Sequence, residues 1–159
     1  MVAVGAVALA ATAAAAVQPN AMRWLGVWVL AAVVGASLSV AANAQKSARS
    51  RHAATKAVLR KFLLAFLPPL FAGAVLTILL ARAGRFEIIP PMWLLLYGTA
   101  VITGGAFSVR LVPVMGACFV AASVFTAALP TAAVNWMMAA AFGGLHLAFG
   151  ILIARRHGG

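Results

Sequence analysis

Long apolar segments alternate along the chain with short segments that contain polar residues or proline. Each apolar segment is close to the length of about 20 residues that a helix needs to cross a bilayer. Strands of membrane barrels instead alternate apolar and polar residues over about ten positions, and the sequence shows no such pattern. A helix satisfies its own backbone groups in lipid, so we predict an all-α integral membrane protein. About six spans are expected, at residues 1–17, 23–43, 62–81, 91–109, 111–129 and 132–154.

The segments between the spans predict how the spans pair. Only Pro130-Thr131 separates the last two spans, which favours a tight hairpin. We therefore expect three helical hairpins in one polytopic membrane domain, residues 1–159. The first span is the weakest, because it is short, mostly alanine, and not preceded by a basic residue. The true start of the protein is left open between Met1, Met22 and a position upstream.

The composition agrees with a membrane protein. Of 159 residues, 65% are apolar and 8% are charged, and the mean hydropathy is +1.09. Soluble domains carry about 25% charged residues. Arginine outnumbers lysine and alanine is abundant, which is typical of a GC-rich bacterial source. We therefore expect a multi-pass protein of the bacterial inner (plasma) membrane.

The distribution of basic residues predicts the orientation, because lysine and arginine near short loops stay on the cytoplasmic side. If both termini are cytoplasmic, nine of the twelve basic residues face the cytoplasm and three face outward. The four tryptophans, which favour the membrane interface, then lie near outer helix ends. The nine are Lys46, Arg49, Arg51, Lys56, Arg60, Lys61, Arg110, Arg155 and Arg156, and the three are Arg23, Arg82 and Arg85.

The segment that begins at Met22 resembles a secretory signal. It has one basic residue, a long apolar run, and Ala42-Asn43-Ala44 before Gln45, a pattern that signal peptidase prefers. Cleavage after Ala44 would place nine basic residues outside and three inside. This reversal of the usual bias favours a retained membrane span.

Four spans carry small residues at every fourth position. Such ridges let helix backbones approach closely in lipid. They favour packing within one compact bundle, and the alternative is self-association of two copies. The ridges are Ala31, Gly35 and Ser39; Ala100, Gly104 and Ser108; Cys118, Ala122 and Thr126; and Ala140, Gly144 and Ala148.

Few residues offer catalytic chemistry. Glu87 is the only carboxylate and lies in an expected outer loop, where we predict a surface pair with Arg82 or Arg85. The sequence has no second carboxylate for acid–base catalysis, no phosphate-binding glycine loop and no zinc-ligand spacing. Cys118, the only cysteine, is expected to be a buried packing residue. We predict that the chain is not an enzyme and holds no metal.

His146 is the one ionisable residue deep within a well-defined span. Polar groups at that depth usually face the protein interior. The structural interpretation is a neutral imidazole that donates to a neighbouring helix, for example to Thr99, Thr103 or Ser123. The functional alternative is a cofactor-binding residue, which contacts haem, another metal or a quinone headgroup. The structural interpretation is favoured, so no cofactor is expected.

The expected cytoplasmic loop, residues 44–61, carries the strongest surface signal. Its basic residues follow helical spacing, which predicts a short helix that continues into the third span. We expect them to set the orientation and contact anionic lipid headgroups, each contributing about 1 kcal/mol. Docking of an acidic cytoplasmic protein is the alternative, and nucleic acid is disfavoured because aromatic residues are absent from the loop. The contact residues are Lys46, Arg49, Arg51, Lys56, Arg60 and Lys61.

These features favour a small non-enzymatic protein that serves as an accessory or structural subunit. Its expected partners are the lipid bilayer, another copy of the chain, or a membrane or cytoplasmic protein. An oligomeric transporter or channel for a small solute is the first alternative. A haem- or quinone-binding membrane subunit centred on His146 is the second.

Overall fold

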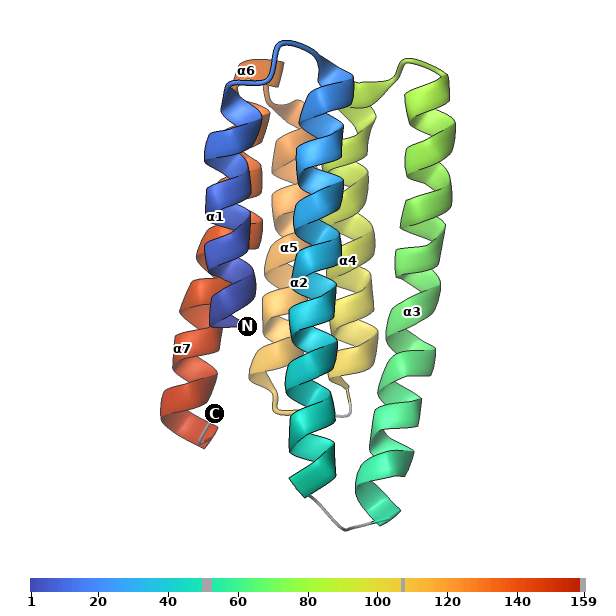
Figure 1. Cartoon of the computed structure of the whole chain (residues 1–159), viewed down its shortest axis with the longest axis vertical. Coiled ribbons are helices and arrows are strands. Elements are labelled where there is room, and N and C mark those ends of the chain that lie inside the picture. The colour runs from blue at the N-terminus through green and yellow to red at the C-terminus, as the bar shows by residue number, and fades with distance from the viewer. Residues whose placement is uncertain (50–52, 107, 158–159) are drawn as a thin grey trace. The chain divides into compact units, whose positions relative to one another are not determined.

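The computed structural model describes the backbone of residues 1–49, 53–106 and 108–157, and the side chains of residues 1–42, 45, 60–106 and 108–156. The described part of the chain is all-helical, without strands, as the sequence predicted (Figure 1). Its elements are α1 (Val2–Ala16), α2 (Ala21–Arg49), α3 (Ala53–Arg82), the 3₁₀ turn η1 (Phe86–Ile88), α4 (Ile89–Gly105), α5 (Leu111–Ala128), α6 (Thr131–Met138), the π-helical segment η2 (Ala139–Leu145) and α7 (His146–His157).

Five segments of the described residues are long and apolar enough to cross a membrane. They lie at Ala21–Ala42, Arg60–Arg82, Phe86–Gly105, Leu111–Ala128 and Thr131–Arg156. The last of these runs through α6, η2 and α7, so its middle is π-helical where a regular α-helix was expected. α1 is apolar but shorter, with 15 residues. The lengths and compositions of these helices indicate a multi-pass membrane protein.

The helices form two compact units. The first contains α1, α2 and the C-terminal segment from Asn135 onward, and the second contains α3, α4 and α5. This grouping differs from the three predicted hairpins, because the fifth and sixth spans belong to different units. The reason is visible in the glycine contacts: α5 packs against α4, whereas the C-terminal helix packs against α1.

In the first unit, α1 is antiparallel to the continuous helix that runs from Asn135 through η2 and α7, here called the C-terminal helix. A Cβ atom added to Gly5 would lie 2.9 Å from the carbonyl oxygen of Gly143, and one added to Gly150 would lie 3.0 Å from the backbone nitrogen of Val2. One face of α1 is buried, at Gly5, Ala8, Ala11, Thr12 and Ala15. The span that seemed weakest in sequence therefore packs closely, because its small residues admit a neighbouring backbone.

In the second unit, α4 lies between α3 and α5. A Cβ atom added to Gly98 would lie 2.8 Å from the carbonyl oxygen of Gly116, and one added to Gly116 would lie 2.7 Å from that of Gly98. On the other side of α4, a Cβ atom at Gly104 would lie 3.0 Å from the Phe62 ring. Glycine thus sets the distance between α4 and both of its neighbours.

Gly98→Ala should lower the free energy of unfolding by about 1–3 kcal/mol, the usual cost of overpacking. Two of the three nearest atoms are backbone atoms of α5, which cannot turn aside as a side chain can. Gly26→Ala is the control, since a Cβ atom there meets nothing within 4 Å. Denaturant titration in detergent measures both variants, and equal stability would contradict the close α4–α5 contact.

The predicted small-residue ridges are only partly used for packing. Ala100 and Gly104 are buried, but Ala140, Gly144 and Ala148 are all exposed. The prediction that this last ridge packs within the bundle is wrong. The C-terminal helix instead buries Gly143, His146 and Gly150, because that face has the glycines that meet α1.

Candidate functional site

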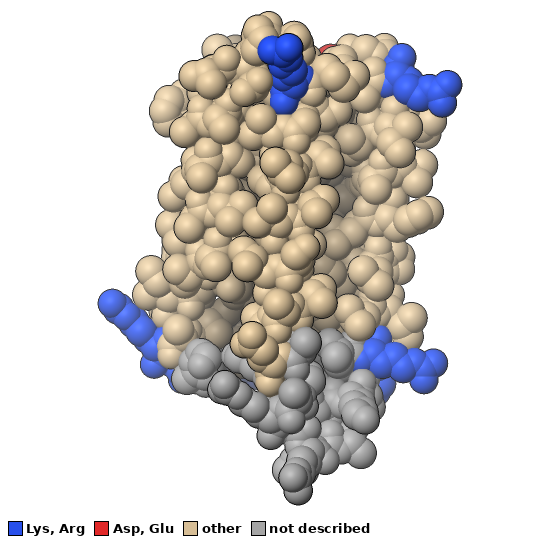
Figure 2. All heavy atoms as spheres, in the orientation of Figure 1, with Lys and Arg blue, Asp and Glu red and all other residues tan. Residues whose placement is uncertain are grey.

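Lys46 and Arg49 lie in the last turn of α2, and Lys56, Arg60 and Lys61 lie within the first three turns of α3. α2 continues to Arg49 and α3 begins at Ala53, so the expected loop is helical wherever its backbone is described. Arg60 and Lys61 are exposed at the start of the apolar part of α3. On the face that Figure 2 shows, Lys and Arg side chains are seen toward the upper and lower parts of the view and not in its middle. The side chains of Lys46, Arg49 and Lys56, and all of Arg51, lie outside the described residues.

Glu87 pairs with Arg85, one of its two predicted partners. The Arg85 Nε atom lies 2.6 Å from Glu87 Oε1, and the two side chains are 60% and 53% exposed. An exposed pair of this kind contributes at most about 1 kcal/mol. The only carboxylate of the chain is therefore engaged at the surface of the second unit.

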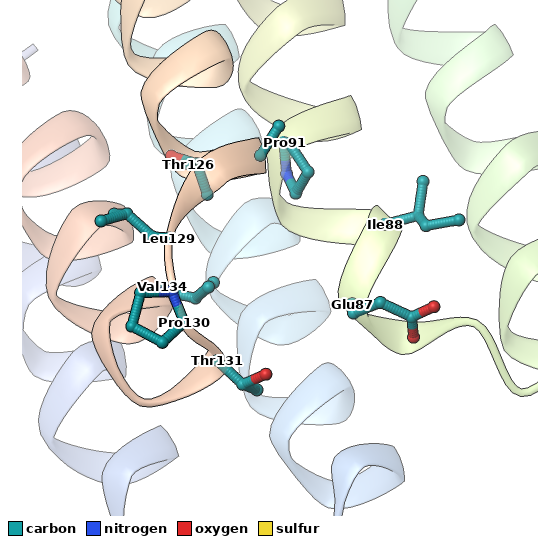
Figure 3. A pocket seen from close by; sticks show the side chains of 9 residues that line it. Glu87, Ile88, Pro91, Thr126, Leu129, Pro130, Thr131 and Val134 are labelled. Atoms are coloured by element: carbon teal, nitrogen blue, oxygen red, sulfur yellow. The ribbon is translucent and has the colours of Figure 1, made fainter.

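A hollow of about 370 Å³ lies beside Glu87, where α4 begins and α5 ends (Figure 3). Six of its nine lining residues are apolar, among them Pro91, Leu129 and Pro130. In Figure 3 the Glu87 carboxylate points away from the Pro130 turn. The buried Thr126 hydroxyl donates to the Ala122 carbonyl at 2.7 Å. The hollow is therefore a depression lined mainly by apolar side chains.

His146 is the first residue of α7 and is only 3% exposed. The Phe142 ring stacks against its imidazole, with the ring centroids 6.2 Å apart and the planes 16° apart. Trp28 contacts the same phenylalanine, at a centroid distance of 6.3 Å. The imidazole thus faces the interior of the first unit.

The hydroxyl groups considered as partners of His146 have acceptors in the second unit. Thr99 donates to the Leu96 carbonyl at 2.9 Å, and Ser123 donates to the Pro91 carbonyl at 2.8 Å. The Thr103 hydroxyl lies within hydrogen-bonding distance of the Ala65 carbonyl oxygen, at 3.1 Å. Each hydroxyl therefore stabilises its own group of helices.

His146→Leu should leave the fold intact and lower the free energy of unfolding by about 1 kcal/mol, the usual net contribution of a buried hydrogen bond. Thermal unfolding in detergent and a visible absorption spectrum are the measurements. A Soret band in the wild type that disappears in the variant would instead favour the haem-binding interpretation.

Asn135 forms a polar cluster in the first unit that sequence analysis missed. Its Oδ1 atom accepts hydrogen bonds from the indole nitrogens of Trp24 and Trp28, at 3.2 and 3.3 Å. Its Nδ2 atom donates to the Thr12 carbonyl at 3.1 Å. The sequence signal was a lone asparagine in an apolar span, a costly residue in lipid unless it is bonded. One amide therefore joins α1, α2 and α6.

Asn135→Ala should lower the free energy of unfolding by about 2 kcal/mol, since three interhelical hydrogen bonds of about 0.6 kcal/mol each are lost. The emission of Trp24 and Trp28 should shift, because both indole donors lose their shared acceptor. Gln18→Ala is the matched control, since that exposed amide bonds only within its own helical region. If both variants unfold alike, Asn135 does not join the helices.

A second polar contact joins helices in the second unit. Trp93 donates through its indole nitrogen to the Thr77 hydroxyl at 2.7 Å, which joins α3 to α4. Cys118 is a half-buried free thiol on α5. Among the described residues, no group of three or more His, Cys, Asp or Glu side chains is placed to hold a metal ion.

Comparison with known proteins identified no relative of this chain. No protein-family model matches the chain, and no match was found among curated proteins or solved structures.

Proposed function

We propose that this chain is a non-enzymatic multi-pass protein of the bacterial inner membrane that acts as an accessory or structural subunit. The observation that carries the proposal is the use of polar side chains inside the helical units. Asn135, Thr77 and Ser123 each take part in hydrogen bonds between helices. A substrate or solute site needs polar groups that are free to meet a ligand, whereas a scaffold uses them for its own assembly.

The proposed orientation places both termini in the cytoplasm. Its support is the asymmetry of nine basic residues against three. In this orientation the basic segment, residues 44–61, meets the headgroups of the inner leaflet. Anionic lipids attract such a segment by about 1 kcal/mol per basic residue.

The apolar surfaces of two long helices support a subunit role. Only 17% of the apolar window of α2 and 6% of that of α3 is buried within the described structure. Phe71 and Ile78 on α3 are 73% and 60% exposed. In a membrane such faces contact either lipid or the helices of another protein. We propose that α3 contacts a partner helix.

Photo-crosslinking in cells tests the proposed partner contact. A photoreactive residue at Phe71 or Ile78 should give one discrete protein adduct, which mass spectrometry identifies. Val124 on α5, 67% exposed, is the control position. If Phe71, Ile78 and Val124 all crosslink only to lipid, the subunit role is wrong.

Purification in mild detergent distinguishes the other two functions. Solute flux through liposomes that contain only this chain would favour the transporter or channel. Bound haem or quinone, detected by absorption and mass spectrometry, would favour the redox subunit. The proposed subunit should show neither and should retain its protein partner.

A further inference from the structure

Two consecutive prolines, Pro68 and Pro69, lie inside α3. Proline has no backbone N–H, so each one removes the hydrogen bond to the carbonyl four residues earlier. The carbonyls that lose their usual donors belong to Leu64 and Ala65. Sharp helix kinks occur at such positions, and in lipid a freed carbonyl needs another donor.

Thr103 on α4 supplies that donor to Ala65. Its hydroxyl lies 3.1 Å from the Ala65 carbonyl oxygen. The same hydroxyl lies 2.9 Å from the carbonyl oxygen of Thr99 and 3.2 Å from that of Ala100, both on its own helix. A hydroxyl has one hydrogen to donate, so the three acceptors compete. A bond to the Ala65 carbonyl joins α4 to α3, whereas a bond to the Thr99 or Ala100 carbonyl stays within α4.

The two halves of α3 are attached to α4 separately. On the C-terminal side of the prolines, Trp93 bonds the Thr77 hydroxyl at 2.7 Å. On the N-terminal side, Phe62 packs against Gly104, and Phe66 contacts the Tyr97 ring edge-on at a centroid distance of 6.1 Å. The proline pair lies between these two attachments.

We propose that Pro68–Pro69 is a hinge in α3 and that the Thr103 hydroxyl is its latch. When the hydroxyl bonds the Ala65 carbonyl, residues 53–67 are held against α4. When it bonds within α4, that segment swings about the prolines while residues 70–82 stay attached through Thr77. Because Arg60 and Lys61 lie on the moving segment, the hinge changes the position of these charges relative to the rest of the unit.

Two pairs of spin labels in the full-length chain, reconstituted in lipid nanodiscs, test the hinge. The background is Cys118→Ala, which removes the only native thiol. The inner pair is Leu64→Cys with Val114→Cys, and the outer pair is Leu79→Cys with Val124→Cys. All four positions are exposed, and both pairs use α5 as the reference helix. Pulsed electron paramagnetic resonance measures the distance distributions.

Thr103→Val removes the latch while preserving side-chain shape, so the inner-pair distribution should shift and broaden while the outer pair stays unchanged. Thr103→Ser keeps the hydroxyl and should restore the wild-type distribution. In Pro69→Ala, the new backbone N–H can bond the Ala65 carbonyl, so adding Thr103→Val should then have no effect.

Three results would overturn the proposal. The first is an unchanged inner pair in Thr103→Val. The second is an equal change in both pairs, which indicates general loosening of the unit. The third is an effect of Thr103→Val that persists in the Pro69→Ala background, because the latch then does not act through the proline-freed carbonyl.

Discussion

Replacing all six basic residues between Lys46 and Lys61 by glutamine should produce a mixture of membrane orientations. The expected cytoplasmic side would keep three basic residues, Arg110, Arg155 and Arg156, against three on the outer side. The charge bias that orients a polytopic protein would then be absent. A reporter fused at Gly159 should be found on both sides of the membrane.

A graded series of glutamine substitutions separates orientation from protein docking. If the charges mainly set orientation, one or two substitutions should change little, and mixed insertion should begin only at five or six. If the segment docks a protein, one or two substitutions among Lys46, Arg49, Lys56 and Arg60 should release that partner with orientation intact. Pull-down and the Gly159 reporter are scored in parallel.

The three expected outer residues provide the matched control for this series. Neutralising Arg23, Arg82 and Arg85 increases the charge bias, so orientation should stay uniform. Early loss of a partner in the inner series, with unchanged orientation, would contradict the lipid-and-orientation role of the basic segment.

The second large effect concerns the signal-like segment that begins at Met22, which we expect to remain attached. Cleavage after Ala44 would remove α1 and most of α2, two of the three helices of the first unit. Gly143 would lose its α1 neighbour, and Asn135 would lose its bonds to both tryptophans and to Thr12. The remaining C-terminal helix would have no partner within its unit.

Intact-mass measurement of the membrane-extracted protein tests this expectation, and an N-terminal tag should be recovered on the mature chain. A variant that starts at Gln45 should be degraded or aggregate, because its C-terminal helix exposes the buried His146 and the unbonded Asn135 amide. A mature wild-type chain that begins at Gln45 would contradict both the retained span and the composition of the first unit.

The sequence by itself was enough to predict the structural class and the approximate position of each apolar helix. Length and hydrophobicity are local properties, and a bilayer requires both of every span. The burial of His146 and the pairing of Glu87 with a nearby arginine were also predicted. In each case the alternatives were few, since the chain has one carboxylate and one histidine deep in a span.

Only the tertiary structure decided which helices pack together and which polar groups meet. In lipid all spans are similarly apolar, so pairing depends on close backbone approach and on individual donors and acceptors. Alanine is so common here that several faces of one helix offer small residues. The face that packs against α1 contains Gly143, whereas the sequence analysis had expected the face that contains Gly144. Asn135 and the Thr12 carbonyl are 123 residues apart in sequence, and Thr103 and the Ala65 carbonyl are 38 residues apart, separations that no local pattern reports.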